Sequence, residues 1–168
     1  LTYYIDFVAK GASISGFPEW LPSERVVEQR VIDTLRKVFE LNGFIGIETR
    51  AVETGASLLK KGETSKEIYL LSRLQEVGHE SDTPIEERLG LHFDLTVPLS
   101  RYVVEHSGAL AFPFKRWQIQ KVWRGERPQE GRFREFVQAD IDESAEINDV
   151  ANDTFQLIAR MQIFQRED

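Results

Sequence analysis

Cysteine is absent from this 168-residue sequence. Its absence excludes disulfide bonds and thiolate metal sites, and it is typical of proteins from a reducing compartment. The sequence also lacks any apolar run near the roughly twenty residues that a membrane-spanning helix needs. The first ten residues carry neither a basic leader nor a small-residue cleavage site. We therefore expect no signal peptide, no membrane anchor and a cytoplasmic location.

An excess of basic residues is missing as well. Lys and Arg number 21 against 28 Asp and Glu, and the net charge is -7. A molecule with this charge binds nucleic acids or anionic membranes only through a local basic site. The three histidines, His79, His92 and His106, lie on separate segments without metal-ligand spacing, so we expect structural roles and no zinc. With 41% hydrophobic and 29% charged residues, the chain is predicted to form one ordinary globular domain.

Apolar periodicity predicts one long helix and one long hairpin. From Ser23 to Asn42 apolar residues recur at steps of three and four, and Gly43 stands where a helix is expected to end. Residues 114–125 and 132–142 resemble strands, and the turn formers of "ERPQEG" between them predict an antiparallel hairpin. We expect shorter strands at 1–8, 44–49, 68–71 and 89–96, helices at 55–60, 98–106 and 148–165, and an exposed loop at 75–88. The predicted fold class is α+β, a largely antiparallel sheet flanked by helices.

The second hairpin strand, "RFREFVQADID", carries an unusual amount of charge. Side chains alternate along a strand, so we expect one face to line the core, namely Phe133, Val137, Ala139 and Ile141, interrupted by Glu135. The other face holds Arg132, Arg134, Phe136, Gln138, Asp140 and Asp142. Its composition alone favours a solvated surface. An aromatic ring between arginines and an amide favours instead a stacking surface for a base, beside guanidinium donors for phosphates.

Three ordered segments resemble one enzyme family. The segment "VWRGERPQEGRFREFVQADID" resembles motif 2 of the class II aminoacyl-tRNA synthetases, in the form found in histidyl-tRNA synthetases. "LHFDLTVPLSRYV" is similar to the segment before motif 2, and "GFPEWLPSERVVEQRVIDTLRKVFELNGFIGIETRAVE" is similar to the N-terminal loop, motif 1 helix and following strand. The resemblance runs from about Gly11 to Asp142. It implies one partial catalytic domain over 1–168, with motif 1 at about 23–53, the motif 2 hairpin at about 114–142 and a divergent terminal helix at about 146–165.

The resemblance implies a histidine–tRNA ligase. Such an enzyme joins L-histidine to ATP, forming histidyl-adenylate and pyrophosphate, and then transfers the histidyl group to tRNA(His). It implies ATP with Mg²⁺ as a substrate and a homodimer formed through the motif 1 region. Carried onto the matching positions, it implies that Arg124 is the catalytic residue that bridges the histidine carboxylate and the α-phosphate. It further implies an ATP-binding set made of Arg124, Glu126, Arg132, Arg134 and Phe136.

The resemblance also implies a histidine-binding set made of Asp94, Thr96, Arg124, Gln138 and Asp142. Gln138 and Asp142 lie four residues apart on one strand face, so both can point into the same cleft. For Asp94 the alternative is a helix cap before Pro98, and for Asp142 a turn residue at the strand end.

The sequence departs from the family pattern in two places. Arg50 stands where motif 1 usually carries proline, and the glycine and short loop that normally follow "QADID" are replaced. The sequence also ends before the histidine-specific glycine-rich segment, motif 3 and the anticodon-binding domain, so we expect the chain alone to be inactive. Two alternatives stay open: a synthetase-like regulatory subunit of ATP phosphoribosyltransferase in histidine biosynthesis, and a structural module whose strand charges are solvated. The retained Arg124, Glu126, Phe136 and Gln138 count against the regulatory subunit.

Overall fold

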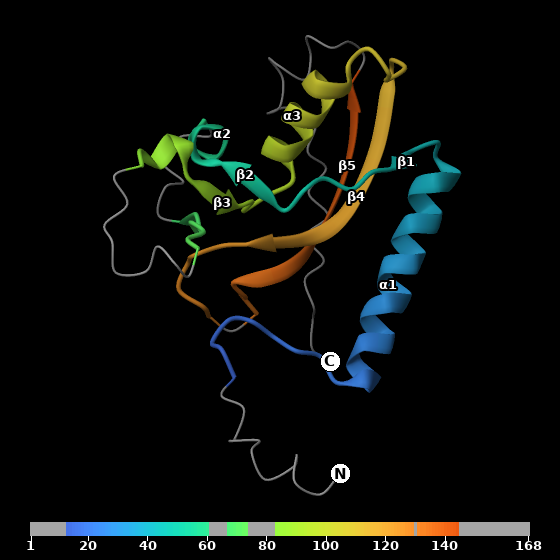
Figure 1. The fold of residues 1–168 in the computed structure, drawn as a ribbon. Coiled ribbons are helices and arrows are strands. Elements are labelled where there is room, and N and C mark those ends of the chain that lie inside the picture. Colours follow the sequence, from blue (N-terminus) through green and yellow to red (C-terminus); the bar gives the residue numbers. More distant parts are fainter. Residues whose placement is uncertain (1–12, 61–66, 74–82, 130, 145–168) are drawn as a thin grey trace, which may run out of the picture.

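The computed structural model describes residues 13–60, 67–73, 83–129 and 131–144 (Figure 1). The elements along the chain are α1 (Pro22–Leu41), β1 (Ile45–Gly46), β2 (Val52–Thr54), α2 (Gly55–Leu59), η4 (Ile85–Glu87), β3 (Leu89–Leu91), α3 (Thr96–His106), β4 (Phe114–Trp123) and β5 (Glu135–Ser144). The strand predicted at 1–8 and the helix predicted at 148–165 lie outside the described residues, as does most of the predicted loop at 75–88.

The predicted hairpin is present as β4 and β5. The antiparallel register pairs Phe114 with Ser144 at one end and Trp123 with Glu135 at the other. β1 adds a parallel edge to β4, and β2 pairs with β3 in a second, antiparallel sheet. The α+β class with mostly antiparallel pairing is therefore confirmed. Three short strands are smaller than predicted. The segment 44–49 pairs only at Ile45–Gly46, 68–71 forms a single bridge from Leu70 to Gly90, and 89–96 pairs only at Leu89–Leu91.

The long helix α1 begins and ends close to the predicted residues. Pro22 occupies the first turn, where its missing N–H costs nothing, and the Glu24 carboxylate accepts the Leu21 N–H at 2.8 Å. After the last turn, Gly43 adopts a φ of 81°. A residue with a side chain is disfavoured in this left-handed conformation, so glycine ends the helix cleanly.

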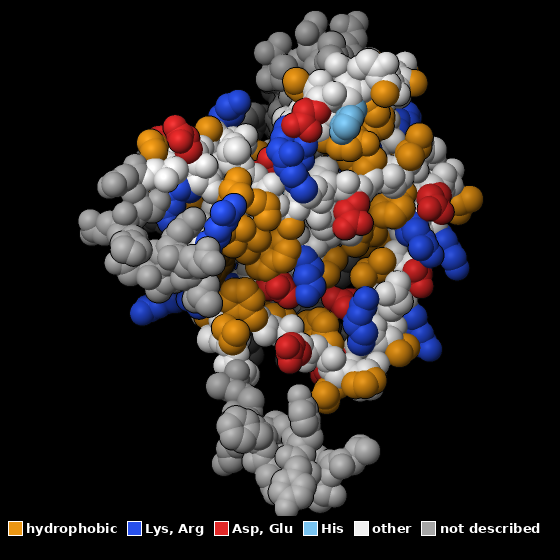
Figure 2. Space-filling model, in the orientation of Figure 1, with side chains coloured by type: hydrophobic (Ala, Val, Ile, Leu, Met, Phe, Trp, Pro, Cys, Tyr) orange, Lys and Arg blue, Asp and Glu red, His pale blue; other side chains and the backbone are white. Residues whose placement is uncertain are grey.

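Most of the apolar stripe of α1 faces solvent. Leu35 and Phe39 are buried at 9% and 5% exposure, whereas Val27, Val31 and Val38 are 59%, 38% and 49% exposed. Figure 2 shows hydrophobic side chains exposed among acidic and basic ones on one face of the molecule. Within the described residues, only part of the stripe that predicts this helix is therefore covered.

Helix α3 covers the other side of the hairpin from α1 (Figure 1). Leu99 and Val103 of α3 pack with Phe114 of β4 in a buried apolar cluster. The helix predicted from Pro98 begins two residues earlier, at Thr96. This cluster holds α3 against the hairpin and so sets where the start of the helix lies.

The prediction of which hairpin face is buried is wrong. Arg116, Gln118 and Val122 of β4, and Asp140 of β5, all lie on the even-numbered face and are between 0% and 8% exposed. The odd-numbered residues that were expected in the core are only half-buried, namely Phe133, Val137, Ala139 and Ile141. The even-numbered face is buried because its polar side chains bind one another and the segment around Thr49 covers them. On the second hairpin strand, Asp140 of this face is buried, Arg134, Phe136, Gln138 and Asp142 are half-buried and Arg132 is exposed, so the alternative of a solvated face holds only at Arg132.

Candidate functional site

The even-numbered side of the hairpin carries a row of mostly polar side chains. We call it the polar face and define it as Arg116, Gln118, Gln120, Arg124, Phe136, Gln138, Asp140 and Asp142. The strand register places Arg116 opposite Asp142 and Gln118 opposite Asp140. Directly opposed side chains in an antiparallel pair are close neighbours, so the register itself brings unlike charges together.

Arg124 lies at the end of the polar face nearest the turn. Its Nε donates to the Phe93 carbonyl oxygen at 3.0 Å, and its Nη2 donates to the Gln138 Oε1 at 3.4 Å. Its guanidinium carbon is 5.0 Å from the ring centroid of Phe136, within cation–π range. The structure thus brings together Arg124, Phe136 and Gln138, three of the residues predicted from the sequence.

Three further polar contacts lead from this end toward the opposite end of the hairpin. The Gln138 Nε2 donates to Asp140 Oδ2 at 2.9 Å. Beyond it, the Arg116 guanidinium forms an ion pair with Asp142 and donates from Nη1 to Gln118 Oε1 at 3.4 Å. Arg124 and Arg116 therefore stand at the two ends of the polar face, where Arg116 pairs with Asp142, and between them lie Gln118, Gln120, Gln138 and Asp140.

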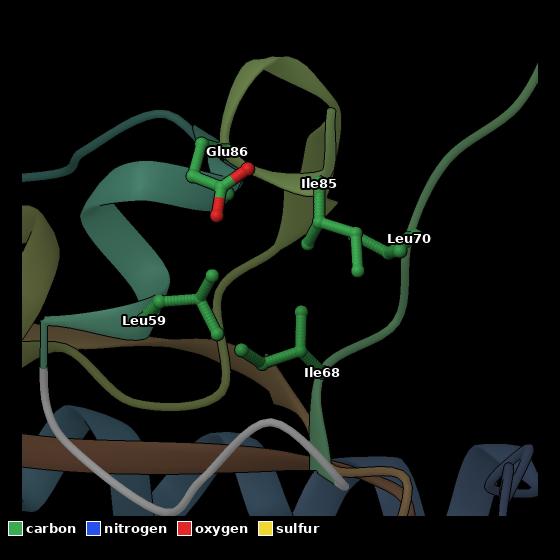
Figure 3. A pocket seen from close by; sticks show the side chains of 6 residues that line it. Leu59, Ile68, Leu70, Ile85 and Glu86 are labelled. Atoms are coloured by element: carbon green, nitrogen blue, oxygen red, sulfur yellow. The ribbon is translucent and has the colours of Figure 1, made fainter. Parts of the chain in front are cut away.

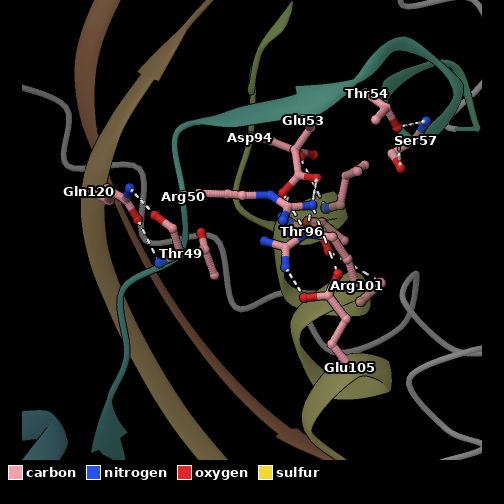
Figure 4. A network of polar contacts seen from close by, with 12 residues as sticks. Thr49, Arg50, Glu53, Thr54, Ser57, Asp94, Thr96, Arg101, Glu105 and Gln120 are labelled. Carbon is pink, nitrogen blue, oxygen red and sulfur yellow. Dashed lines mark hydrogen bonds and ion pairs between the residues drawn. The ribbon is translucent and has the colours of Figure 1, made fainter. Parts of the chain in front are cut away.

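The segment before β2 is fastened onto the polar face by amide side chains. Gln120 Nε2 donates to the Thr49 carbonyl oxygen at 2.7 Å (Figure 4). Gln118 Nε2 donates to the Thr49 hydroxyl oxygen at 2.9 Å. These bonds satisfy polar groups that burial would otherwise leave without partners. Sequence analysis missed Arg116, Gln118 and Gln120, although their alternation in "RWQIQ" matches the alternation of "QADID" on the facing strand.

Burial and charge act against each other at Asp142. Burial raises the pKa of this carboxyl above its usual range, the positive charge of Arg116 lowers it, and the negative charge of Asp140 raises it further. Burial also lowers the pKa of Arg116, against the opposing influence of Asp142, Asp140 and Asp94. The positive charge of Arg116 therefore opposes the rise that burial and Asp140 cause in the Asp142 pKa.

Asp94 and Thr96 sit at the start of α3. Asp94 is 4% exposed, and its Oδ1 accepts the N–H groups of Thr96 at 3.2 Å and Val97 at 3.4 Å. The helix-cap role named as the alternative for Asp94 is therefore confirmed. Its charge also acts on Arg116, so the same carboxylate belongs to the surroundings of the polar face. Figure 4 shows Asp94 and Thr96 at the N-terminal end of the helix.

The remaining predicted residues gather near the turn. Arg132 Nη1 lies 3.1 Å from Glu126 Oε2, and Arg134 Nε donates to the Glu126 carbonyl oxygen at 3.1 Å. A second carboxyl, that of Glu67, lies close enough to feel the charge of Glu126. Burial, and then this negative charge, raise the pKa of Glu67. The Gly16 carbonyl accepts the Arg134 N–H at 2.7 Å, and a Cβ at Gly16 would lie 2.8 Å from Arg134 Cγ. The loop around Gly16 therefore fixes the position of Arg134 beside the hairpin turn.

A buried carboxylate ties β2 to α3. Glu53 is 1% exposed, and Arg101 Nε donates to both of its carboxylate oxygens, at 2.8 and 3.0 Å (Figure 4). Arg101 also binds Glu105 at 2.6 Å, while Arg50 lies 3.3 Å from Glu53. The buried charge of Glu53 is tolerated because it is paired with arginines and hydrogen-bonded. The network sets the position of α3 and hence of the two candidate residues at its start.

The polar face is separate from a small apolar cavity. This cavity has a volume of about 150 Å³ and is lined by Gly55, Leu59, Ile68, Leu70, Ile85 and Glu86. Figure 3 shows Leu59 and Ile68 pointing toward one another across it. Pockets for small-molecule ligands usually enclose about 300 Å³ or more. Since none of the predicted site residues lines the cavity, it does not belong to the candidate site.

The described histidines make structural contacts. His92 is fully buried, with its Nε2 at 2.7 Å from the Lys121 carbonyl oxygen and its ring 5.5 Å from that of Trp123. His106 lies against Tyr102, with 4.6 Å between ring centroids, and His79 is outside the described residues. Among the residues that the structure describes, no three His, Asp or Glu side chains form a metal-binding group, and no helix is long and apolar enough to cross a membrane.

Comparison with known proteins identifies histidine–tRNA ligases as relatives. The chain is 99% identical over 135 residues to a histidine–tRNA ligase of Bifidobacterium longum subsp. infantis, a match that covers 80% of this chain and 29% of the relative. A solved histidyl-tRNA synthetase from Nostoc sp. PCC 7120 is 43% identical, with a TM-score of 0.67 over 82% of this chain and 29% of that one. No family model matches the chain.

A more distant structure shows the same fold. It is an ATP phosphoribosyltransferase regulatory subunit/histidyl-tRNA synthetase from Bacillus halodurans, 20% identical, with a TM-score of 0.64 over 79% of this chain and 32% of that one. This likeness extends to the fold alone. The chain spans less than a third of the length of the curated ligase described above.

Proposed function

Because the chain belongs to the histidine–tRNA ligase family, we propose that its polar face forms part of the site that activates histidine with ATP. In this reaction the histidine carboxylate attacks the α-phosphate of ATP, giving histidyl-adenylate and pyrophosphate, and the histidyl group then passes to tRNA(His). The observation that carries the proposal is the position of Arg124, which is held beside Phe136 and Gln138 on the polar face.

Arg124 addresses the main electrostatic difficulty of activation. The attacking carboxylate and the phosphate are both anions, and further charge develops in the transition state. A fixed guanidinium that contacts both partners stabilises this charge, and a single well-placed donor typically contributes about 3 kcal/mol. The bonds from Arg124 to Phe93 and Gln138 hold its planar group in place before substrate arrives.

The rest of the ATP would lie toward the turn. We propose that Phe136 stacks on adenine, that Glu126 contacts the adenine edge, and that Arg132 and Arg134 meet the distal phosphates, with Mg²⁺ arriving as part of the substrate. Arg124 already lies 5.0 Å from the Phe136 ring centroid. An adenine and a guanidinium cannot share one ring face, so we propose that adenine uses the face of Phe136 opposite Arg124.

The histidine would lie at the acidic end of the polar face. Substrate histidine presents an ammonium group and an imidazole N–H, both of which need acceptors. We propose Asp94, Thr96, Gln138 and Asp142 as its contacts. Gln138 already bonds both Arg124 and Asp140, so it connects the region of the reacting carboxylate with the region that receives the ammonium group.

The wider roles of the protein follow from the same family membership. We propose that tRNA(His) is the second substrate, that the protein acts in the cytoplasm without zinc, and that it forms a homodimer through the motif 1 region. The exposed valines of α1 provide an apolar surface for the dimer contact. Since the chain spans 29% of the length of the curated relative, we propose that it does not complete the reaction by itself.

The decisive assay is histidine-dependent ATP–pyrophosphate exchange. It is run on this chain and on the same chain continued by the remaining sequence of the Bifidobacterium relative. We expect exchange only in the longer form, because this chain spans 29% of the length of the relative. We expect it only when histidine is present, because the acidic end of the polar face suits an ammonium group together with an imidazole donor. Absence of exchange in the longer form would reject the ligase proposal and favour the regulatory-subunit or structural alternative.

A further inference from the structure

Arg116 is a cation in an unusually buried position. Its side chain is 1% exposed, although it lies at the end of the polar face away from the turn. Buried arginines are rare and energetically costly unless they are well paired. We propose that Arg116 is a positioning residue that keeps Asp142 ionised and correctly oriented to receive the cationic group of substrate histidine. This inference rests on the function proposed above for the polar face.

The contacts of Arg116 fix both the guanidinium and its partner. Arg116 stands directly opposite Asp142 in the strand register and forms an ion pair with it through Nη2. Its Nη1 donates to Gln118, whose amide is in turn held by the Thr49 hydroxyl at 2.9 Å. The guanidinium is therefore anchored on two sides by groups from different strands and segments. Such anchoring restricts the Asp142 carboxylate to one orientation.

The charges around Arg116 do not balance. The acidic groups that face it are Asp142 and Asp140 on β5 and Asp94 before α3, so three carboxylates surround one guanidinium. The local excess of negative charge suits an ammonium group together with an imidazole donor. Without Arg116, the same carboxylates would face one another in a poorly solvated site. Like charges in such a site favour protonation of one member.

Protonation of Asp142 would remove an acceptor from the substrate site. Burial already raises the pKa of Asp142, and the charge of Asp140 raises it further, while Arg116 is the opposing influence. Loss of the positive charge should therefore raise this pKa further. Histidine binding should then weaken at neutral pH and recover as the pH rises and Asp142 ionises.

The test compares three variants of the chain with the unaltered protein. The Asp142 carboxyl pKa is followed by ¹³C NMR, and the Kd values for L-histidine and for ATP are measured by calorimetry between about pH 5.5 and pH 9. We expect Arg116→Met to raise the Asp142 pKa and to weaken histidine binding about tenfold at pH 7. ATP binding should change little, because Arg124 and Phe136 lie at the other end of the polar face.

The other two variants separate charge from shape. Arg116→Lys keeps the positive charge and should restore the pH profile of histidine binding. Asp140→Asn removes a like charge and should lower the Asp142 pKa, the opposite direction from Arg116→Met. If Arg116→Met does not fold, the direction of the Asp140→Asn shift decides the matter, because an unchanged or raised Asp142 pKa would overturn the inference.

The outcomes distinguish this inference from the proposed function. Histidine binding by the unaltered chain, with the same Asp142 pKa and the same pH profile in Arg116→Met, would overturn the positioning role and leave the proposed function intact. If the unaltered chain bound no histidine at any pH, the proposed function and the positioning role would both be rejected.

Discussion

Arg124 combines three kinds of contact that only an arginine side chain supplies together. It donates one hydrogen bond to a backbone carbonyl and one to an amide, and its flat face lies near an aromatic ring. A lysine would retain the charge but could not form the planar fork that contacts two groups at once. The proposed bridging of carboxylate and phosphate needs this fork, so charge alone should not replace it.

We therefore predict that Arg124→Ala lowers the rate of histidine-dependent pyrophosphate exchange in the longer form by about 100-fold. Arg124→Lys should recover only a small part of that loss. The matched control is Arg36→Ala on α1, which removes an exposed arginine paired with Asp33 and should leave exchange unchanged. Exchange at the normal rate in Arg124→Ala would show that this guanidinium has no part in the chemistry.

At the scale of the element, the β4–β5 hairpin is stabilised near its turn by one carboxylate. Glu135 accepts the Trp123 Nε1–H at 2.7 Å and lies 2.5 Å from Lys121 Nζ. Burial acts to raise the pKa of Glu135, but the bonds from Lys121 and Trp123 outweigh it and lower the pKa below the usual 4.5. The ionised carboxylate therefore stabilises the folded state above about pH 4.5, and this contribution is lost as the pH falls through the lowered pKa.

We predict that Glu135→Gln lowers the free energy of unfolding by about 1 kcal/mol at pH 7. The difference from the unaltered chain should shrink as the pH falls below 4.5. Urea denaturation followed by tryptophan fluorescence at several pH values measures it. Glu143→Gln serves as the control, because the Glu143–Lys115 pair on the same hairpin is exposed and should contribute little. Equal losses in the two variants, or a loss independent of pH, would contradict this account of Glu135.

The same hairpin shows how far the sequence predicts the structure. Alternation and turn chemistry predict the two strands and their antiparallel pairing. They do not predict the register, because the two sides of the turn differ in length. Arg124 bonds Arg134 and Gln129 pairs with Arg132, so the four residues 125–128 lie opposite the single residue Phe133. With a turn of unequal sides, the sequence does not reveal that Arg116 and Asp142 lie opposite each other on the paired strands.

The wrong assignment of the hairpin faces has a related cause. Hydropathy predicts that the face with Val137 and Ile141 lines the core, because charged residues such as Arg116 and Asp140 are expected to be exposed. These polar residues are buried since their partners come from the facing strand and from Thr49, which lies far away in the sequence. The grouping of Arg124, Phe136 and Gln138, by contrast, follows from short sequence spacing and could be predicted.

At the scale of the whole molecule, α1 presents an uncovered apolar surface. At 100° per residue, Val27, Val31 and Val38 project within a narrow arc, next to the arc of the buried Leu35 and Phe39. The three valines are each at least 38% exposed. A contiguous exposed apolar stripe commonly marks a contact with another molecule, which agrees with the proposed dimer.

We predict that Val31→Asp converts a dimer into a monomer. A carboxylate in the apolar contact would be desolvated without a partner, at a cost of several kcal/mol. Sedimentation velocity at micromolar concentration distinguishes the two states. Arg36→Asp provides the control, because this side chain projects from a different side of α1 and the variant should remain dimeric. A monomeric unaltered chain, or a dimeric Val31→Asp variant, would rule out this surface as the dimer contact.

The central claim is that the polar face of the hairpin binds histidine and ATP. The most direct measurement is backbone amide chemical-shift mapping of the chain, titrated with L-histidine and with ATP and Mg²⁺. We predict that histidine shifts the amides around Gln138 and Asp142, while ATP shifts those around Arg124 and Phe136. Shifts confined to the apolar cavity around Leu59, or no shifts at millimolar ligand, would contradict the claim.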